Sequence, residues 1–197
     1  MSLFSFLRAV LLVLLPLALI VGLGKAMIRF VRRHPVAAPH ILNHAQKPLN
    51  RRLHGYDADD VAAHWAPLSE PRLRQERTLL RLDLVYPLFY GGILMLALLQ
   101  AWEWLGRPFV VHWLAVPVAL TVLADWMENG VQLLQLRRWM RADEPGVKDL
   151  SPFLIRLASL ATCTKIWLLF GLLSLLIVLA VWTGFTPTAG PPQSAHL

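Results

Sequence analysis

Three segments of the 197-residue chain carry charged and hydroxyl side chains at helical spacing within otherwise apolar sequence. In each segment the polar residues recur three or four positions apart, so they share one face of a helix. A lysine can pair with carboxylates there, and confined carboxylates can bind a cation, relay protons or act as general acid and base. The site residues that we predict are Asp83, Tyr86 and Tyr90, then Asp125, Glu128 and Asn129, then Ser159, Thr162 and Lys165.

The elements that must position these residues are long apolar helices. Hydrophobic residues make up 56% of the chain and charged residues 16%, whereas an average soluble domain has about 25% charged residues. The apolar blocks near 3–23, 84–104, 109–127 and 166–182 are each close to the ~20 residues that a membrane-spanning helix needs. We therefore predict an all-α fold, a four-transmembrane-helix bundle with a helical cytoplasmic loop between the first and second spans.

Basic residues collect in two of the loops that separate these blocks. Of the 19 Lys and Arg residues, eleven lie between the first and second spans and five between the third and fourth. Because cytoplasmic loops concentrate Lys and Arg, both loops are predicted to be cytoplasmic and both termini periplasmic, in a cell inner membrane. This distribution also explains the net charge of +7, so the charge gives no reason to expect a nucleic-acid partner.

The first block has a second possible interpretation. Arg8 followed by an apolar stretch and small residues also describes a cleavable signal peptide. Cleavage and export would place both basic loops outside the cytoplasm, and for this reason an uncleaved anchor is favoured.

Four regions follow from this pattern: a first transmembrane helix at 1–24, a cytoplasmic loop with amphipathic helices at 25–81, a three-helix transmembrane region at 82–183, and a disordered external tail at 184–197. A short cytoplasmic loop at 136–157 interrupts the third region. Apolar and basic residues interleave at helical spacing over 25–33, which favours contact with anionic lipid at the inner surface.

Two helix starts are predicted within the first loop. Acidic residues from Asp57 to Asp60 precede 61–65, which favours a short helix with its acids at the N-terminus. Ser69 and Pro71 begin a second helix, which we expect to run into the membrane without a break.

The polar faces are predicted to meet at one level in the cytoplasmic half of the membrane. At about 1.5 Å per residue, Asp125 and Lys165 each lie about 13 Å inside, and we expect them to form the central pair. Glu128 and Asp83 are then titratable or cation-facing groups. The residues expected to orient them through hydrogen bonds are Asn129, Tyr90, Ser159 and Thr162.

Pro87 is expected to add a backbone carbonyl to the polar groups at this depth. Proline lacks an N–H, so the carbonyl of Asp83, four residues earlier, loses its usual donor and the helix is expected to kink there. Gly91 and Gly92 follow and permit close approach of a neighbouring helix.

Three carboxylates facing one ammonium leave an excess of negative charge. Protons, a cation, a ligand or a loop arginine such as Arg81 or Arg156 could compensate it. Several roles stay open: binding or passage of a small ion or lipid head group, a lipid-modifying enzyme with Asp125 and Glu128 as acid and base, and a structural partner of another membrane protein or a second copy. The network could also serve only to fix helix register.

No cofactor or metal is predicted. His40 and His44 lie four residues apart, but Pro39 and Pro48 flank them, so we expect a solvated pair. The single cysteine, Cys163, cannot form a disulfide within one chain, and the sequence contains no phosphate-binding loop or G-x-S-x-G motif.

Three of these motifs together resemble a family of bacterial four-span membrane proteins with no assigned activity. The motifs are the runs 82–91 (LDLVYPLFYG), 125–129 (DWMEN) and 158–165 (ASLATCTK), with Gly55-Tyr56 as a further similarity. The likeness covers about Gly55 to Trp182. It implies a four-helix fold and a polar site, and it implies no reaction.

Overall fold

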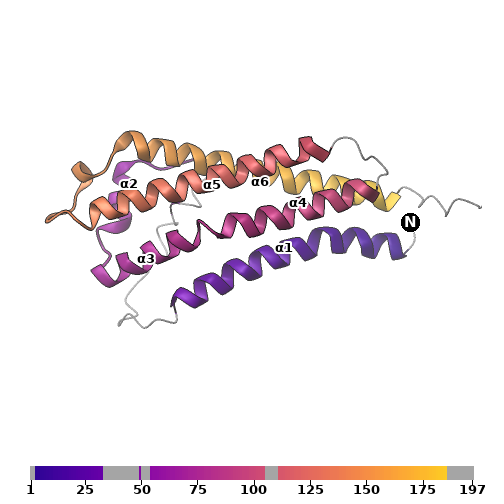
Figure 1. The fold of residues 1–197 in the computed structure, drawn as a ribbon, viewed down its shortest axis with the longest axis horizontal. Coiled ribbons are helices and arrows are strands. Elements are labelled where there is room, and N and C mark those ends of the chain that lie inside the picture. The colour runs from indigo at the N-terminus through magenta and orange to yellow at the C-terminus, as the bar shows by residue number, and fades with distance from the viewer. Residues whose placement is uncertain (1–2, 33–48, 50–53, 105–110, 186–197) are drawn as a thin grey trace, which may run out of the picture.

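The computed structural model describes residues 3–32, 49, 54–104 and 111–185, and this part of the chain is helical, without strands. Figure 1 shows the long helices running lengthwise beside one another, with α2 at one end of the bundle. The elements in chain order are α1 (Leu3–Arg32), α2 (Ala58–Trp65), α3 (Glu70–Leu82), α4 (Tyr86–Trp104), α5 (Val111–Trp139), a short 3-10 turn (Val147–Asp149) and α6 (Pro152–Phe185). The predicted all-α class is confirmed for these residues.

Three stretches of the described chain are long and apolar enough to cross a membrane, rather than the four expected. They are Val10–Phe30, Glu70–Glu103 and Pro152–Trp182. The helix α5 is 29 residues long but does not qualify by composition, since Asp125, Glu128 and the polar residues that follow lower its hydropathy. Those side chains are buried inside the bundle, where α5 packs against both α4 and α6.

The first helix covers one side of the bundle and exposes most of its apolar surface. It contacts α6, α4 and α3, but only Leu12 and Pro16 are buried among its described side chains. It continues past the expected end of the first span at residue 24, as far as Arg32. The hydroxyl of Tyr86 donates a 2.9 Å hydrogen bond to the Ile20 carbonyl of α1, and a Cβ at Gly24 would lie 3.1 Å from that hydroxyl.

The second predicted span is interrupted where the polar residues begin. After its Ser69 N-cap, α3 ends at Leu82, and α4 begins only at Tyr86. The helix is therefore interrupted where a kink was predicted, and the expectation of an unbroken helix is wrong. Pro87 supplies no N–H to the preceding turn, so the Asp83 carbonyl lacks its usual helical donor.

Side chains of α5 satisfy the carbonyls that this break frees. The Asn129 Nδ2 donates to the Asp83 carbonyl at 3.1 Å, and the Trp126 Nε1 donates to the Leu84 carbonyl at 2.7 Å. Close contact between α4 and α5 is possible because Gly91 has no side chain: a Cβ there would lie 2.7 Å from the Val122 side chain. Gly92 meets nothing within 4 Å, so only one of the two glycines has the predicted role.

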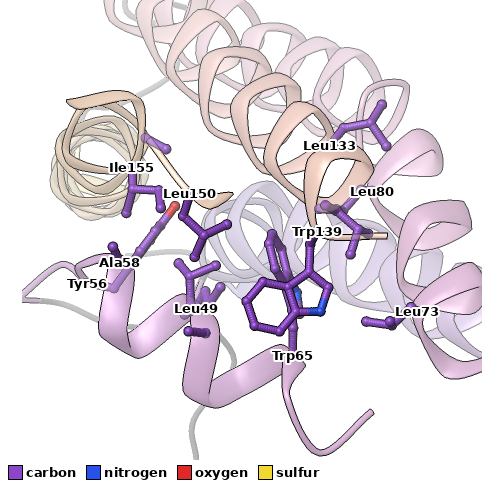
Figure 2. Packing of buried hydrophobic residues seen from close by; sticks show 14 residues of the cluster. Leu49, Tyr56, Ala58, Trp65, Leu73, Leu80, Leu133, Trp139, Leu150 and Ile155 are labelled. Carbon is purple, nitrogen blue, oxygen red and sulfur yellow. The ribbon is translucent and has the colours of Figure 1, made fainter. Parts of the chain in front are cut away.

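The short helix α2 docks across the ends of α5 and α6. Asp57 caps it, and Asp57 and Asp60 form a reciprocal capping box, which confirms the predicted helix start. Figure 2 shows the apolar cluster beneath it, in which the Trp65 and Trp139 rings lie edge to face with centroids 6.0 Å apart. This cluster anchors the segment that precedes α2.

Gly55 directs that segment into the bundle through a positive φ of 81°. An added Cβ would lie 2.3 Å from the Ser159 hydroxyl, which accepts a 2.8 Å hydrogen bond from the Tyr56 N–H. Only glycine adopts this backbone conformation without strain and leaves room for the α6 side chain.

We expect Gly55→Ala to lower the free energy of unfolding by about 1–3 kcal/mol, because alanine introduces both backbone strain and a steric clash. Thermal unfolding of the purified protein in detergent measures the effect. Gly146→Ala is the matched control, since a Cβ there meets nothing within 4 Å. Equal melting temperatures for the two variants would contradict this account of Gly55.

Candidate functional site

Lys165 of α6 lies at the centre of a buried polar network. Its ammonium donates to Asp125 Oδ1 at 2.8 Å and to Glu128 Oε2. Both acids face the same side of α5 because they are three residues apart. The exposed fractions of Lys165, Asp125 and Glu128 are 8%, 6% and 0%. The predicted pair of Asp125 and Lys165 is confirmed, and Glu128 shares the same ammonium.

The Asp125 carboxylate is held by two further donors. The Tyr90 hydroxyl donates to Oδ2 at 2.9 Å, and the Asn129 amide donates to Oδ1 at 3.1 Å. The same Asn129 nitrogen reaches the Asp83 carbonyl at the break between α3 and α4. These contacts connect the α5–α6 ion pair to α4 and to the end of α3, and Tyr90 and Asn129 both form hydrogen bonds to the acid, as predicted. We call this the Asp125 arm of the network.

A second arm of the network extends from the Glu128 carboxylate in the opposite direction, toward the segment before α2. We call it the Glu128 arm. Gln132 donates one hydrogen bond to Glu128 Oε1 at 3.2 Å and another to the Tyr56 hydroxyl at 2.9 Å. Burial, reinforced by the charge of Glu128, raises the pKa of Tyr56 to about 12. A phenol outside the apolar spans is thereby connected to the centre of the bundle.

Ser159 and Thr162 contribute to the Glu128 arm through different contacts. The Ser159 hydroxyl accepts the Tyr56 N–H, while the Thr162 hydroxyl donates to the Ala158 carbonyl at 3.0 Å and interacts with Tyr56 and Glu128. Tyr56 and Gln132 were not among the predicted site residues. Gln132 continues the polar face of Asp125 and Glu128 at helical spacing, and Tyr56 was indicated only by the Gly55-Tyr56 similarity.

Asp83 and Tyr86 lie on the α1 side of the network, against a cavity of about 240 Å³. Asp83, Tyr86, Tyr90, Asp125 and Lys165 provide its polar groups, and aliphatic side chains of α1, α4 and α6 provide the rest of its wall. Within the described residues the Asp83 carboxylate accepts no hydrogen bond and forms no ion pair. The Tyr86 and Tyr90 rings are edge to face, with centroids 5.4 Å apart.

The charges of the site do not balance within the described part of the chain. Lys165 is the only ammonium among the site residues and pairs with two carboxylates, which leaves Asp83 as a third acid without a basic partner. Arg81 and Arg156, the loop arginines considered as compensating charges, are both exposed, and neither pairs with these acids within the described residues. Within the described residues, the negative charge of the site therefore exceeds the positive charge.

Metal binding receives no support from the described residues, where no group of three or more His, Cys, Asp and Glu side chains could hold an ion. His40 and His44 lie outside the described residues.

No protein-family model, curated protein or solved structure matches this chain. The resemblance to bacterial four-span proteins therefore stays an expectation, and the residues and their geometry carry the assignment of function.

A double-mutant cycle tests the central ion pair. Lys165→Met should lower the free energy of unfolding by about 3–5 kcal/mol, because it leaves two buried carboxylates without a cation. Asp125→Asn should be less destabilising, since Lys165 keeps Glu128 and the amide keeps an acceptor for its donors.

The double variant should recover part of the loss, with a coupling energy of about 0.5–3 kcal/mol. Chemical denaturation in a fixed detergent provides all four free energies. Strictly additive losses would contradict direct pairing of the two side chains.

Proposed function

We propose that this protein is an integral membrane protein whose cavity, lined by aliphatic side chains and a few polar groups, binds a small cation or a lipid head group. The observation that carries the proposal is the cavity of about 240 Å³, which reaches Asp83, Asp125 and Lys165 from the α1 side of the bundle. A network that served only adhesion would require no such space and no unpartnered carboxylate. Ligand sites in proteins combine a mostly apolar wall with a few convergent polar groups in the same way.

The proposal includes four membrane spans, with α5 as the span that composition alone does not identify. Its support is the burial of the α5 polar side chains between α4 and α6, which leaves Leu120 and Leu123 among the residues facing outward. Charged residues inside a membrane face the bundle interior and pair with one another in this manner.

The proposed orientation places the α2 end of the bundle in the cytoplasm of a bacterial cell, with the protein in the inner membrane. At this end lie the last turns of α1, all of α3, the end of α5 and the start of α6 (Figure 1). These segments carry most of the described basic residues, including Lys25, Arg29, Arg137 and Arg138. Contact with anionic lipid at the inner surface is a further part of this proposal.

A lipid-modifying enzyme that uses Asp125 and Glu128 as acid and base has less support. Such an enzyme needs a cavity that reaches both carboxylates, but Glu128 is 0% exposed and does not line the cavity. Both acids are also held by Lys165.

An assembly role is supported only by an apolar groove of about 310 Å³ between α1 and α4, lined among others by Leu15, Leu19 and Leu96. Acyl chains of surrounding lipid would fill this groove equally well.

Blocking the cavity tests the proposed binding. We expect a lipid or a monovalent cation to raise the melting temperature of the detergent-purified protein, since a ligand of the folded state stabilises it. Leu169→Trp should abolish the increase, because Leu169 lines the cavity. Leu160→Trp is the control on the exposed side of the same helix, where the residue is 65% exposed. Loss of the increase in both variants, or in neither, would contradict the proposed site.

Single-cysteine labelling tests the number of spans. In a Cys163→Ser background, Asp143→Cys should react with an impermeant thiol reagent only from the cytoplasmic side, and Glu103→Cys only from the opposite side. These positions flank α5, which must therefore cross the membrane if they are labelled from different sides. Labelling of both from one side would show that α5 does not cross.

A further inference from the structure

The cavity presents one hydrogen-bond donor and one acceptor that the described residues leave without a partner. A lysine ammonium has three N–H donors, and Lys165 uses two of them for Asp125 and Glu128. The Asp83 carboxylate accepts no hydrogen bond from the described residues. Both Lys165 and Asp83 line the same cavity, so a ligand there meets a cationic donor and an anionic acceptor together.

The other polar groups of the cavity are already engaged. The Tyr90 hydroxyl donates to Asp125 and the Tyr86 hydroxyl donates to the Ile20 carbonyl. Asp125 accepts from three donors, from Lys165, Tyr90 and Asn129. A ligand therefore finds its strongest polar partners at Asp83 and Lys165, which carry opposite charges.

The remainder of the wall is aliphatic and excludes a ligand that needs polar contacts on every side. It consists of Leu17 and Ile20 from α1, Leu94 from α4, and Leu169 and Leu173 from α6. A bare hard cation requires several oxygen ligands around it, whereas this cavity offers polar groups on one side only. An amphipathic molecule satisfies both parts of the wall.

We propose that the cavity binds a zwitterionic head group with a primary ammonium and a phosphate. The ammonium pairs with the Asp83 carboxylate, and the phosphate accepts the third N–H of Lys165. This assignment rests on the proposed function and names its ligand class. A volume of about 240 Å³ is smaller than the roughly 300–1,000 Å³ of pockets that enclose a whole drug-sized ligand. It therefore accommodates the head group and the first methylenes, while longer acyl chains extend outside.

The same chemistry occurs in a membrane phospholipid and in free phosphoethanolamine. The aliphatic wall favours the phospholipid, because only the lipid provides apolar groups to contact it. A choline head group has no N–H that could donate to the Asp83 carboxylate, and a glycerol head group has no ammonium at all.

Native mass spectrometry of the full-length protein in detergent tests this inference with four probes: phosphatidylethanolamine, phosphatidylcholine, phosphatidylglycerol and phosphoethanolamine. Phosphatidylethanolamine should bind at least about tenfold more tightly than phosphatidylcholine and phosphatidylglycerol, as expected for one charge-assisted hydrogen bond. It should also bind more tightly than phosphoethanolamine, which has no apolar groups for the aliphatic wall. Asp83→Asn should remove the preference over phosphatidylcholine and phosphatidylglycerol. Asp143→Asn, the same change at an exposed residue of the α5–α6 connection, should retain it.

The melting temperature of Asp83→Asn shows whether the variant is folded, and Leu169→Trp provides a second way to block the cavity if it is not. Two outcomes would overturn the head-group assignment and leave the proposed site intact. One is that phosphatidylcholine binds as tightly as phosphatidylethanolamine, and the other is that phosphatidylglycerol binds more tightly, provided that Leu169→Trp abolishes the binding in each case. Equal binding of phosphoethanolamine would overturn the lipid as the source of the head group. If no cavity variant changes the binding of any of the four probes, and Leu169→Trp also keeps the stabilisation by a monovalent cation, both the assignment and the proposed function are overturned.

Discussion

A lysine ammonium buried between two helices loses several kcal/mol of hydration, which only well-placed carboxylates can offset. Lys165 meets this requirement with two acids of α5, spaced so that both face α6. Sliding or rotating either helix by one residue would separate the ammonium from at least one of them. The ion pair thus fixes the register of α5 against α6, and the remaining polar contacts of the bundle are built around that register.

Two arms extend from this centre because each carboxylate has further acceptor capacity. Through Tyr90 and Asn129, the Asp125 arm reaches the break between α3 and α4 and supplies a donor to a freed carbonyl. The Glu128 arm reaches Tyr56 through Gln132. An unsatisfied polar group in an apolar interior costs several kcal/mol, so each arm makes the local backbone geometry depend on the ion pair.

The α1 side of the network differs from the other sides. Among the described contacts, α1 offers the network a single backbone carbonyl, that of Ile20, and otherwise aliphatic side chains. It provides no charge to balance Asp83 and no acceptor for the third proton of Lys165. This asymmetry leaves a cavity on the side of the bundle that α1 covers, and α1 itself buries few of its described side chains.

The sequence by itself determined what depends on one helix or one turn. Helical periodicity placed Asp125 and Glu128 on a common face, Asp57 predicted the start of α2, and Pro87 predicted the carbonyl without a donor at Asp83. Tertiary structure decided which groups met: that Glu128 shares Lys165, that Asn129 serves the Asp83 carbonyl, and that Gly55 brings Tyr56 against Ser159. Periodicity fixes the face of a helix on which a side chain lies, but the neighbour that this face meets depends on helix rotation and on packing between residues far apart in the chain.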